Sequence, residues 1–159
     1  MNTKVIVRFT KDNMKRVYYT PAHINSYLLN IARQMYKDNF RPNYIVGIAR
    51  GGLVPAIKLS HYLDIPMYAL NKGESNHWIP EDALEGKRIL VIDDINDTGT
   101  TIRNLKKEWS ESQGDWGKIF RIGNVKFATL IDNDASEEFV DYSGFTINKC
   151  ENPEWCVFP

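Results

Sequence analysis

The sequence predicts an α/β fold: a single domain with a mostly parallel central sheet and helices on both faces. Three short apolar runs have the length of buried strands: "YIVGIA" (residues 44–49), "RILVID" (88–93) and "VKFATLI" (125–131). Helical patterns separate these runs, and strands that alternate with helices form parallel sheets covered on both sides. The length of 159 residues suits one domain with a sizeable core, spanning residues 1–159.

The N-terminal part of the chain predicts a hairpin followed by a helix. "KVIVRF" (4–9) and "RVYYT" (16–20) are rich in β-branched and aromatic residues and flank a polar turn, so we expect an N-terminal hairpin within residues 1–20. Thr20 and Pro21 have the types preferred at a helix cap and at the first helical position. Apolar residues follow at helical spacing: Ile24, Tyr27, Leu28, Ile31 and Met35.

The rest of the chain continues the alternation. Residues 66–70 predict a short strand, and residues 71–86 are polar without a clear period, as in many functional lids. An edge strand is expected at 144–148, within a small C-terminal hood over about 134–159. Two further helices are indicated by side chains at helical spacing, Leu53, Ile57, Ser60 and Leu63 in the first and Ile102, Leu105 and Trp109 in the second.

Composition excludes several classes of partner. Twenty basic residues balance twenty acidic ones, so the chain has no net positive charge that would attract nucleic acid or anionic lipid. No apolar run approaches the ~20 residues that span a membrane, and the N-terminus lacks the apolar core of a secretory signal. Cys150 and Cys156 are too few for a disulfide scaffold, and we expect reduced thiols in the cytoplasm.

The stretch "DTGTT" (residues 97–101) predicts a phosphate site between a strand and a helix. A helix start presents unpaired backbone N–H groups and the positive end of the helix dipole. Gly99 lets the backbone approach a ligand closely, while Thr98, Thr100 and Thr101 add hydroxyl donors. The alternative is a plain helix cap, but a cap needs only one such residue.

Asp93 and Asp94 precede this loop and suit a different part of a ligand. Two carboxylates repel a phosphate, but they accept hydrogen bonds from sugar hydroxyls or bind a hard cation such as Mg²⁺. A sugar phosphate would therefore satisfy both halves of the stretch. Asp97 is a separate carboxylate that could act in proton transfer. A solvated acidic pair at a strand end is the alternative.

"RGG" (residues 50–52) offers a second anion site. Gly51 and Gly52 free the backbone to turn its N–H groups toward a ligand, and Arg50 adds positive charge. Alone, two glycines indicate only a tight turn. Because both loops follow strands of a predicted parallel sheet, they are expected at the same edge of that sheet.

These residues resemble the type I phosphoribosyltransferases. "VIDDINDTGTT" is similar to the signature of that family, and "VGIARGGLVPAIKLSHYLDIP" is similar to its pyrophosphate-loop region. "WCVFP" resembles the closing segment of xanthine and hypoxanthine/guanine phosphoribosyltransferases. The resemblance implies an enzyme of purine salvage, a glycosyltransferase that moves phosphoribose from 5-phospho-α-D-ribosyl 1-pyrophosphate (PRPP) to a purine, with a 6-oxopurine favoured. It also implies Mg²⁺, a cytoplasmic location and a homo-oligomer, either a dimer or a tetramer.

The resemblance also implies a role for each part of the site. Residues 97–101 would hold the 5′-phosphate, Asp93 and Asp94 the ribose hydroxyls and the metal, and residues 50–52 the pyrophosphate. Asp97 would accept a proton near N7 of the purine. Trp155 would stack on the base, the backbone at Val157 would read its edge, and residues 71–86 would close over the site.

One departure bears on the choice of base. Asn133 stands where the purine subgroup usually has a lysine that contacts the 6-oxo group, and an amide can donate to a 6-oxo group or accept from a 6-amino group. Asn133 is thus a candidate base-binding residue, unless its loop lies outside the pocket. The departure leaves open which purine is used, and it keeps a second hypothesis: a non-catalytic regulator with an intact PRPP site. A signalling receiver domain is disfavoured, because "DTGTT" has no role there.

Overall fold

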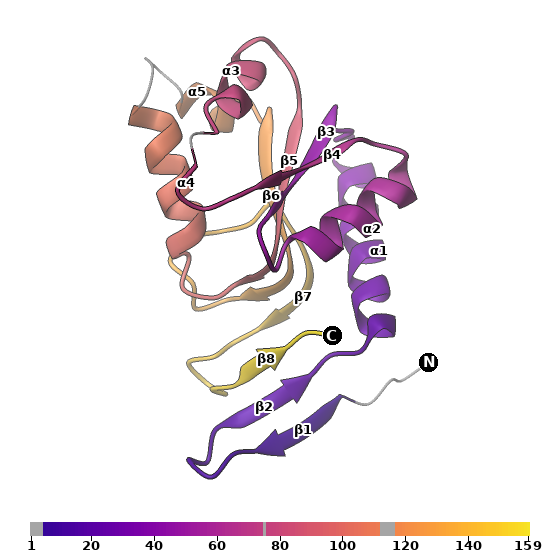
Figure 1. Cartoon of the computed structure of the whole chain (residues 1–159), viewed down its shortest axis with the longest axis vertical. Coiled ribbons are helices and arrows are strands. Elements are labelled where there is room, and N and C mark those ends of the chain that lie inside the picture. The colour runs from indigo at the N-terminus through magenta and orange to yellow at the C-terminus, as the bar shows by residue number, and fades with distance from the viewer. Residues whose placement is uncertain (1–4, 75, 112–116) are drawn as a thin grey trace.

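The computed structural model of the chain describes residues 5–74, 76–111 and 117–159. Its main sheet has the strand order β4-β3-β5-β6-β7, and every neighbouring pair is parallel (Figure 1). The predicted α/β fold with a parallel central sheet is therefore confirmed. The strands are β3 (Tyr44–Ile48), β4 (Met67–Leu70), β5 (Ile89–Asn96), β6 (Val125–Asn133) and β7 (Tyr142–Ile147).

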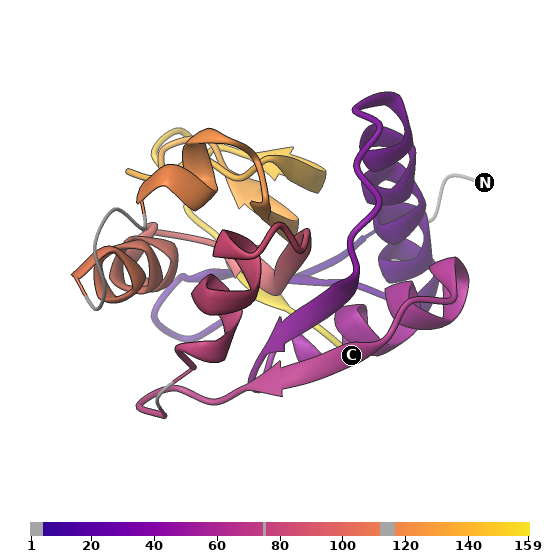
Figure 2. The same ribbon diagram turned by 90° about the horizontal axis from the view of Figure 1, so that it is seen from above.

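Helices cover both faces of this sheet (Figures 1 and 2). On β5, Leu90 and Ile92 are buried in the cluster formed with the first two helices, whereas Ile89 and Val91 are buried in the cluster formed with the other three. This alternation follows from the pleat, which points successive side chains to opposite faces. The helices are α1 (Pro21–Lys37), α2 (Leu53–Leu63), α3 (Trp78–Leu84), α4 (Thr100–Glu111) and α5 (Gly117–Arg121).

Helices α1 and α2 differ in how well their buried faces were predicted. In α1, the Thr20 side chain caps the helix by accepting from the His23 backbone N–H, and all five predicted apolar residues are buried. In α2, the expected face is wrong at Ile57, which is 46% exposed. The helix instead turns Pro55, Ala56 and Leu59 to the core. The reason is close packing, since a Cβ on Gly47 of β3 would lie 2.7 Å from the Ala56 Cβ.

Two connections contain helices that the sequence pattern did not indicate. Within the expected lid at 71–86, α3 buries Ile79, Pro80 and Ala83, so it is part of the packed structure. The segment before β6 contains α5. Residues 112–116 and the first residues of the predicted hairpin lie outside the described part of the chain. Helices this short contain too few turns to give a periodic signal.

A second, small sheet combines the two ends of the chain. The hairpin strands β1 (Ile6–Phe9) and β2 (Lys15–Tyr18) are antiparallel, and β8 (Trp155–Val157) pairs with β2 in parallel. Of the segment expected to form a hood, β7 joins the main sheet and β8 joins the hairpin. Figure 1 shows the small sheet beside the end of the main sheet at which β7 finishes. Among the described residues, no helix is both long and apolar enough to cross a membrane.

Candidate active site

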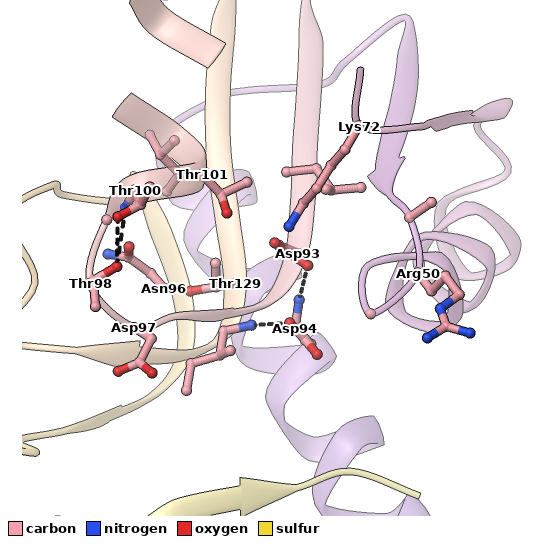
Figure 3. A pocket seen from close by; sticks show the side chains of 16 residues that line it. Arg50, Lys72, Asp93, Asp94, Asn96, Asp97, Thr98, Thr100, Thr101 and Thr129 are labelled. Atoms are coloured by element: carbon pink, nitrogen blue, oxygen red, sulfur yellow. Dashed lines mark hydrogen bonds between the residues drawn. The ribbon is translucent and has the colours of Figure 1, made fainter. Parts of the chain in front are cut away.

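A cleft of about 310 Å³ opens where β3 and β5 end (Figure 3). The parallel arrangement places these strand ends at one edge of the sheet, so the two glycine-containing loops face the same space. Nine of the candidate site residues predicted from the sequence line the cleft: Arg50, Gly51, Asp93, Asp94, Asp97, Thr98, Gly99, Thr100 and Thr101.

The loop between β5 and α4 has the geometry of an anion site. Gly99 has a φ of +90°, and a Cβ there would lie 2.8 Å from both the Glu138 backbone N and the Ser136 Oγ. Glycine is therefore required, both for its backbone conformation and for the close packing behind the loop. The Thr98 and Thr100 hydroxyl oxygens lie 2.9 Å apart at the start of α4. The backbone N–H groups of the first helical turn have no partners within the helix and can bind an anion.

Asp93 and Asp94 form a close acidic pair beside this loop. The Asp94 backbone N–H donates to Asp93 Oδ1 at 2.9 Å, and the Ile95 N–H donates to Asp94 Oδ1 at 2.7 Å. Burial and, after it, the charge of Asp94 raise the pKa of Asp93 from an ordinary 3.8 to about 8. Because the two carboxyl groups repel each other when both are charged, the pair favours ligands that carry a positive charge or hydroxyl donors.

The two glycines after Arg50 have different roles. A Cβ on Gly51 would lie 2.2 Å from Asp94 Oδ2, so the absence of a side chain lets this loop contact the acidic pair. A Cβ on Gly52 would lie 2.3 Å from the Ile92 carbonyl oxygen and 2.7 Å from the Ile48 N. Gly52 is buried and does not line the cleft, and it supports the loop by packing against the main sheet.

The structure adds cleft residues that sequence reasoning missed. Lys72 follows β4, and its ammonium points toward Asp93 in Figure 3. Thr129 pairs with Asp93 across β5 and β6, is 1% exposed, and has no hydrogen-bond partner for its hydroxyl among the described residues. One indication in the sequence pointed to Lys72, because this cation comes two residues after the end of a predicted strand. Thr129 had none, because its place depends on strand register.

The residues expected to contact a base lie outside this cleft. Asn133 is 7% exposed, and its amide is engaged by three backbone groups. Its Nδ2 donates to the Asp97 carbonyl oxygen at 2.8 Å, and its Oδ1 accepts from the N–H groups of Ala135 (3.2 Å) and Lys149 (3.0 Å). This arrangement makes Asn133 a support for the Asp97 loop.

Trp155 and Val157 lie in the small sheet. Trp155 is 55% exposed and lines a wide hollow together with Phe9 and Lys149. The Val157 carbonyl oxygen accepts a hydrogen bond of 2.9 Å from the Tyr19 N–H. A contact of either residue with a base stays a prediction.

Lys149 connects this hollow to the cleft, and sequence reasoning missed it as well. Its Nζ donates to Asp97 Oδ2 at 2.9 Å, and the lysine side chain is 19% exposed against 42% for the aspartate. The two residues are 52 positions apart, and no local pattern indicates their contact.

A sequence model of the phosphoribosyl transferase domain matches residues 15–159. The chain belongs to the phosphoribosyl transferase family. The match begins at β2 and includes every residue that lines the cleft.

Individual members of the family are similar to the chain over most of its length. The xanthine phosphoribosyltransferase 1 of Saccharomyces cerevisiae is 26% identical, over 62% of this chain and 64% of its own. A xanthine-guanine phosphoribosyltransferase of Nitratidesulfovibrio vulgaris is 30% identical, over 72% of this chain and 66% of its own. The chain thus spans slightly under two thirds of the length of these two relatives. The crystal structure of a purine phosphoribosyltransferase from Pyrococcus horikoshii matches with a TM-score of 0.64 and 25% identity, over 91% of this chain and 92% of that one.

Proposed function

We propose that the protein transfers a 5-phosphoribosyl group from PRPP to a purine base and releases pyrophosphate. One observation carries the proposal: a single cleft joins a helix start suited to a phosphate, an acidic pair and a second glycine loop with an arginine. PRPP has a phosphate, a pair of hydroxyls and a pyrophosphate in the matching order. The similar proteins named as xanthine, xanthine-guanine and purine phosphoribosyltransferases support a purine acceptor.

Each part of the donor has a partner in the cleft. The backbone amides and hydroxyls of residues 97–101 hold the 5′-phosphate, and the carboxylates of Asp93 and Asp94 accept hydrogen bonds from the ribose hydroxyls. Arg50 and the backbone of Gly51 face the pyrophosphate. Lys72, which points toward Asp93, adds positive charge near the same groups.

The acidic pair also fits Mg²⁺. Mg²⁺ is commonly bound by one or two carboxylates together with substrate phosphates. The described residues hold no cluster of three or more His, Cys, Asp or Glu suited to a metal, so two carboxylates completed by pyrophosphate oxygens match this pattern. The raised pKa of Asp93 fits as well, since a cation relieves the repulsion from Asp94. When bound, Mg²⁺ would neutralise negative charge on the pyrophosphate.

The transfer replaces a C–O bond with a C–N bond at C1 of the ribose. A base nitrogen donates its lone pair to C1, while the bond from C1 to the pyrophosphate oxygen breaks and its electron pair leaves with pyrophosphate. The Arg50 guanidinium stabilises the charge that collects there. The proton that the base loses passes to the Asp97 carboxylate, which lines the cleft.

In this proposal the base binds beyond Asp97, on the side of the small sheet. Trp155 provides an exposed aromatic face for stacking, and Asn133 acts indirectly by holding the Asp97 loop. A cytoplasmic location and a homo-oligomeric state remain predictions. A non-catalytic regulator is not favoured, because the residues suited to each part of the donor line one cleft together with a carboxylate suited to proton transfer.

The test is a coupled assay of pyrophosphate release with PRPP, Mg²⁺ and each of adenine, guanine, hypoxanthine and xanthine, beside titration calorimetry with PRPP. We expect PRPP to bind and at least one base to turn over. Asp94→Asn should weaken both, whereas the matched change Asp134→Asn, at an exposed acid that does not line the cleft, should alter neither. PRPP binding without turnover of any base would contradict the transferase and support a non-catalytic regulator. Absence of PRPP binding would contradict both hypotheses.

A further inference from the structure

A second cavity, of about 320 Å³, adjoins the donor cleft. It lies between one face of α4 and the segment that follows β4, and we call it the α4 cavity. Thr100, Thr101 and Lys72 line both spaces. We propose that the α4 cavity binds a nucleoside 5′-phosphate with an amino group on its base, such as adenosine 5′-monophosphate (AMP), as a regulatory ligand. No step of the proposed transfer uses this cavity.

The α4 cavity combines apolar walls with amide groups. Ile48, Leu70 and Leu105 provide apolar surface from β3, β4 and α4. Asn76 and Asn104 line the same space and provide hydrogen-bonding groups. This combination suits a planar heteroaromatic ring, because such a ring has apolar faces and an edge that forms hydrogen bonds.

Asn76 is a buried amide with an acceptor to spare. The residue is 6% exposed, and its Nδ2 donates to the Glu74 carbonyl oxygen at 2.9 Å, which fixes the side chain. Among the described residues, no hydrogen bond is recorded for the Asn76 Oδ1. A buried acceptor without a partner is costly, so this oxygen favours a ligand that brings an N–H group into the cavity.

Asn104 offers a whole amide from the wall formed by α4. The residue is exposed, and its side chain has no hydrogen bond recorded within the described part of the chain. An asparagine amide pairs with adenine by accepting from N6 and donating to N7. The second N–H of N6 then suits the Asn76 Oδ1, whereas a 6-oxo group there would bring two acceptors together. The cavity therefore favours an amino group over a carbonyl group.

The charges along α4 set the direction in which such a ligand binds. Thr101 lies in the first turn of α4 and Glu108 about two turns later, roughly 10 Å along the helix axis. Lys72 and the helix start favour a phosphate at the first end, and the Glu108 carboxylate disfavours one at the other. A nucleoside 5′-phosphate spans a comparable length, with its phosphate near Thr101 and its base beside Asn104.

A phosphate in this position would occupy the helix start that the PRPP 5′-phosphate uses in the proposed function. AMP would therefore compete with PRPP and raise the KM for PRPP without changing kcat. The competition rests on the proposed function, whereas the binding of AMP does not. The transferase would in this way respond to the level of adenine nucleotides.

The experiment titrates AMP into the full chain by calorimetry and compares Asn104→Leu with Asp94→Asn. AMP in the α4 cavity needs Asn104, whereas AMP in the donor cleft would place its ribose hydroxyls on Asp94. We expect Asn104→Leu to weaken AMP binding about 10- to 100-fold, as for loss of a bidentate contact to a base, and Asp94→Asn not to weaken it. PRPP affinity should fall only in Asp94→Asn. The matched control Lys107→Met, at a side chain 71% exposed on the same helix, should alter neither.

Two further probes identify the groups that are recognised. Inorganic phosphate should bind more weakly than AMP, and neither it nor inosine 5′-monophosphate should depend on Asn104. AMP binding that is unchanged in Asn104→Leu, or absent at millimolar AMP, would overturn the inference. AMP binding that Asp94→Asn weakens would place the nucleotide in the donor cleft and overturn it as well.

The same readouts distinguish this inference from the proposed function. AMP binding that depends on Asn104, in a protein without turnover, would support the second site and contradict the transferase. Turnover without AMP binding would support the transferase and contradict the second site. Where both hold, AMP should raise the KM for PRPP in wild type but not in Asn104→Leu, and an unchanged KM in wild type would contradict the regulatory role.

Discussion

The backbone N–H of Asp94 donates a hydrogen bond of 2.9 Å to the side chain of Asp93, which fixes the Asp93 carboxyl group in the second half of β5. The contact stabilises the Asp93 carboxylate, but burial and the charge of Asp94 outweigh it, and the pKa of Asp93 is raised. The free protein therefore carries an unfavourable arrangement that a cation or a hydroxyl-rich ligand relieves. Such destabilised groups are common at functional sites.

The first prediction concerns stability and pH. The folded protein holds the Asp93 proton up to about pH 8, whereas the unfolded chain releases it near pH 4, so this group's contribution to stability is lost as pH rises between those values. Asp93→Asn removes this dependence, and asparagine can still accept from the Asp94 N–H. We expect the variant to exceed wild type in Tm above pH 8, with the difference shrinking toward pH 5. Melting curves across this range check it, with Glu111→Gln, an exposed acid on α4, as control. Parallel curves for wild type and Asp93→Asn would contradict the assignment.

The second prediction separates Gly51 from Gly52. Alanine at 52 would press its Cβ against backbone atoms of Ile92 and Ile48, which cannot move without disturbing the sheet. Alanine at 51 would meet the end of the Asp94 side chain, which can rotate away. Gly52→Ala should therefore lower Tm by several degrees, as for an overpacked core. Gly51→Ala should fold normally and weaken PRPP binding, because Asp94 is displaced. Calorimetric melting and PRPP titration on both proteins decide between these effects, and equal loss of Tm in the two variants would refute the distinction.

The third prediction tests Asp97 as proton acceptor. Asp97→Asn removes the basic oxygen but keeps an oxygen that can accept from Lys149, so the loop should stay in place. We expect kcat to fall by about 10²- to 10⁴-fold, the usual range for loss of a general base, with PRPP affinity nearly unchanged. Steady-state kinetics with the preferred base and calorimetry with PRPP measure the two quantities. An unaltered kcat would exclude Asp97 from proton transfer.

The features predicted from the sequence are those encoded locally. The strands β3 and β5 were recognisable because strands covered on both faces are apolar without interruption. The phosphate loop and the "RGG" loop were recognisable because their glycines, acids and hydroxyls lie within a few positions of each other. Their meeting in one cleft follows from parallel topology, which the alternation of strands and helices already indicated.

The features missed depend on contacts between distant segments. Lys149 meets Asp97 across 52 positions and Asn133 across 16, and neither contact leaves a periodic trace. Asn133 was expected to face a base, but its amide is used by the scaffold, a role that becomes visible only when β6 and β7 are placed side by side. The exposed position of Ile57 likewise reflects the tight packing of Ala56 against Gly47, which a hydrophobic pattern cannot indicate.

The last prediction concerns Thr129, which lines the cleft and pairs with Asp93 on the neighbouring strand. Its buried hydroxyl lacks a hydrogen-bond partner among the described residues. An unsatisfied buried hydroxyl costs roughly 1–3 kcal/mol of stability. Thr129→Val removes that polar group with little change in shape, so Tm should rise by roughly 2–4 °C for each kcal/mol recovered. If the hydroxyl contacts the bound donor, the same change weakens PRPP binding, and stability and affinity move in opposite directions. Thermal melting and PRPP titration test this, with Thr146→Val, an exposed strand threonine on β7, as the control that should change neither. A fall in Tm for Thr129→Val would mean that the hydroxyl is satisfied in the free protein, and an unchanged PRPP affinity would place it outside the donor contacts.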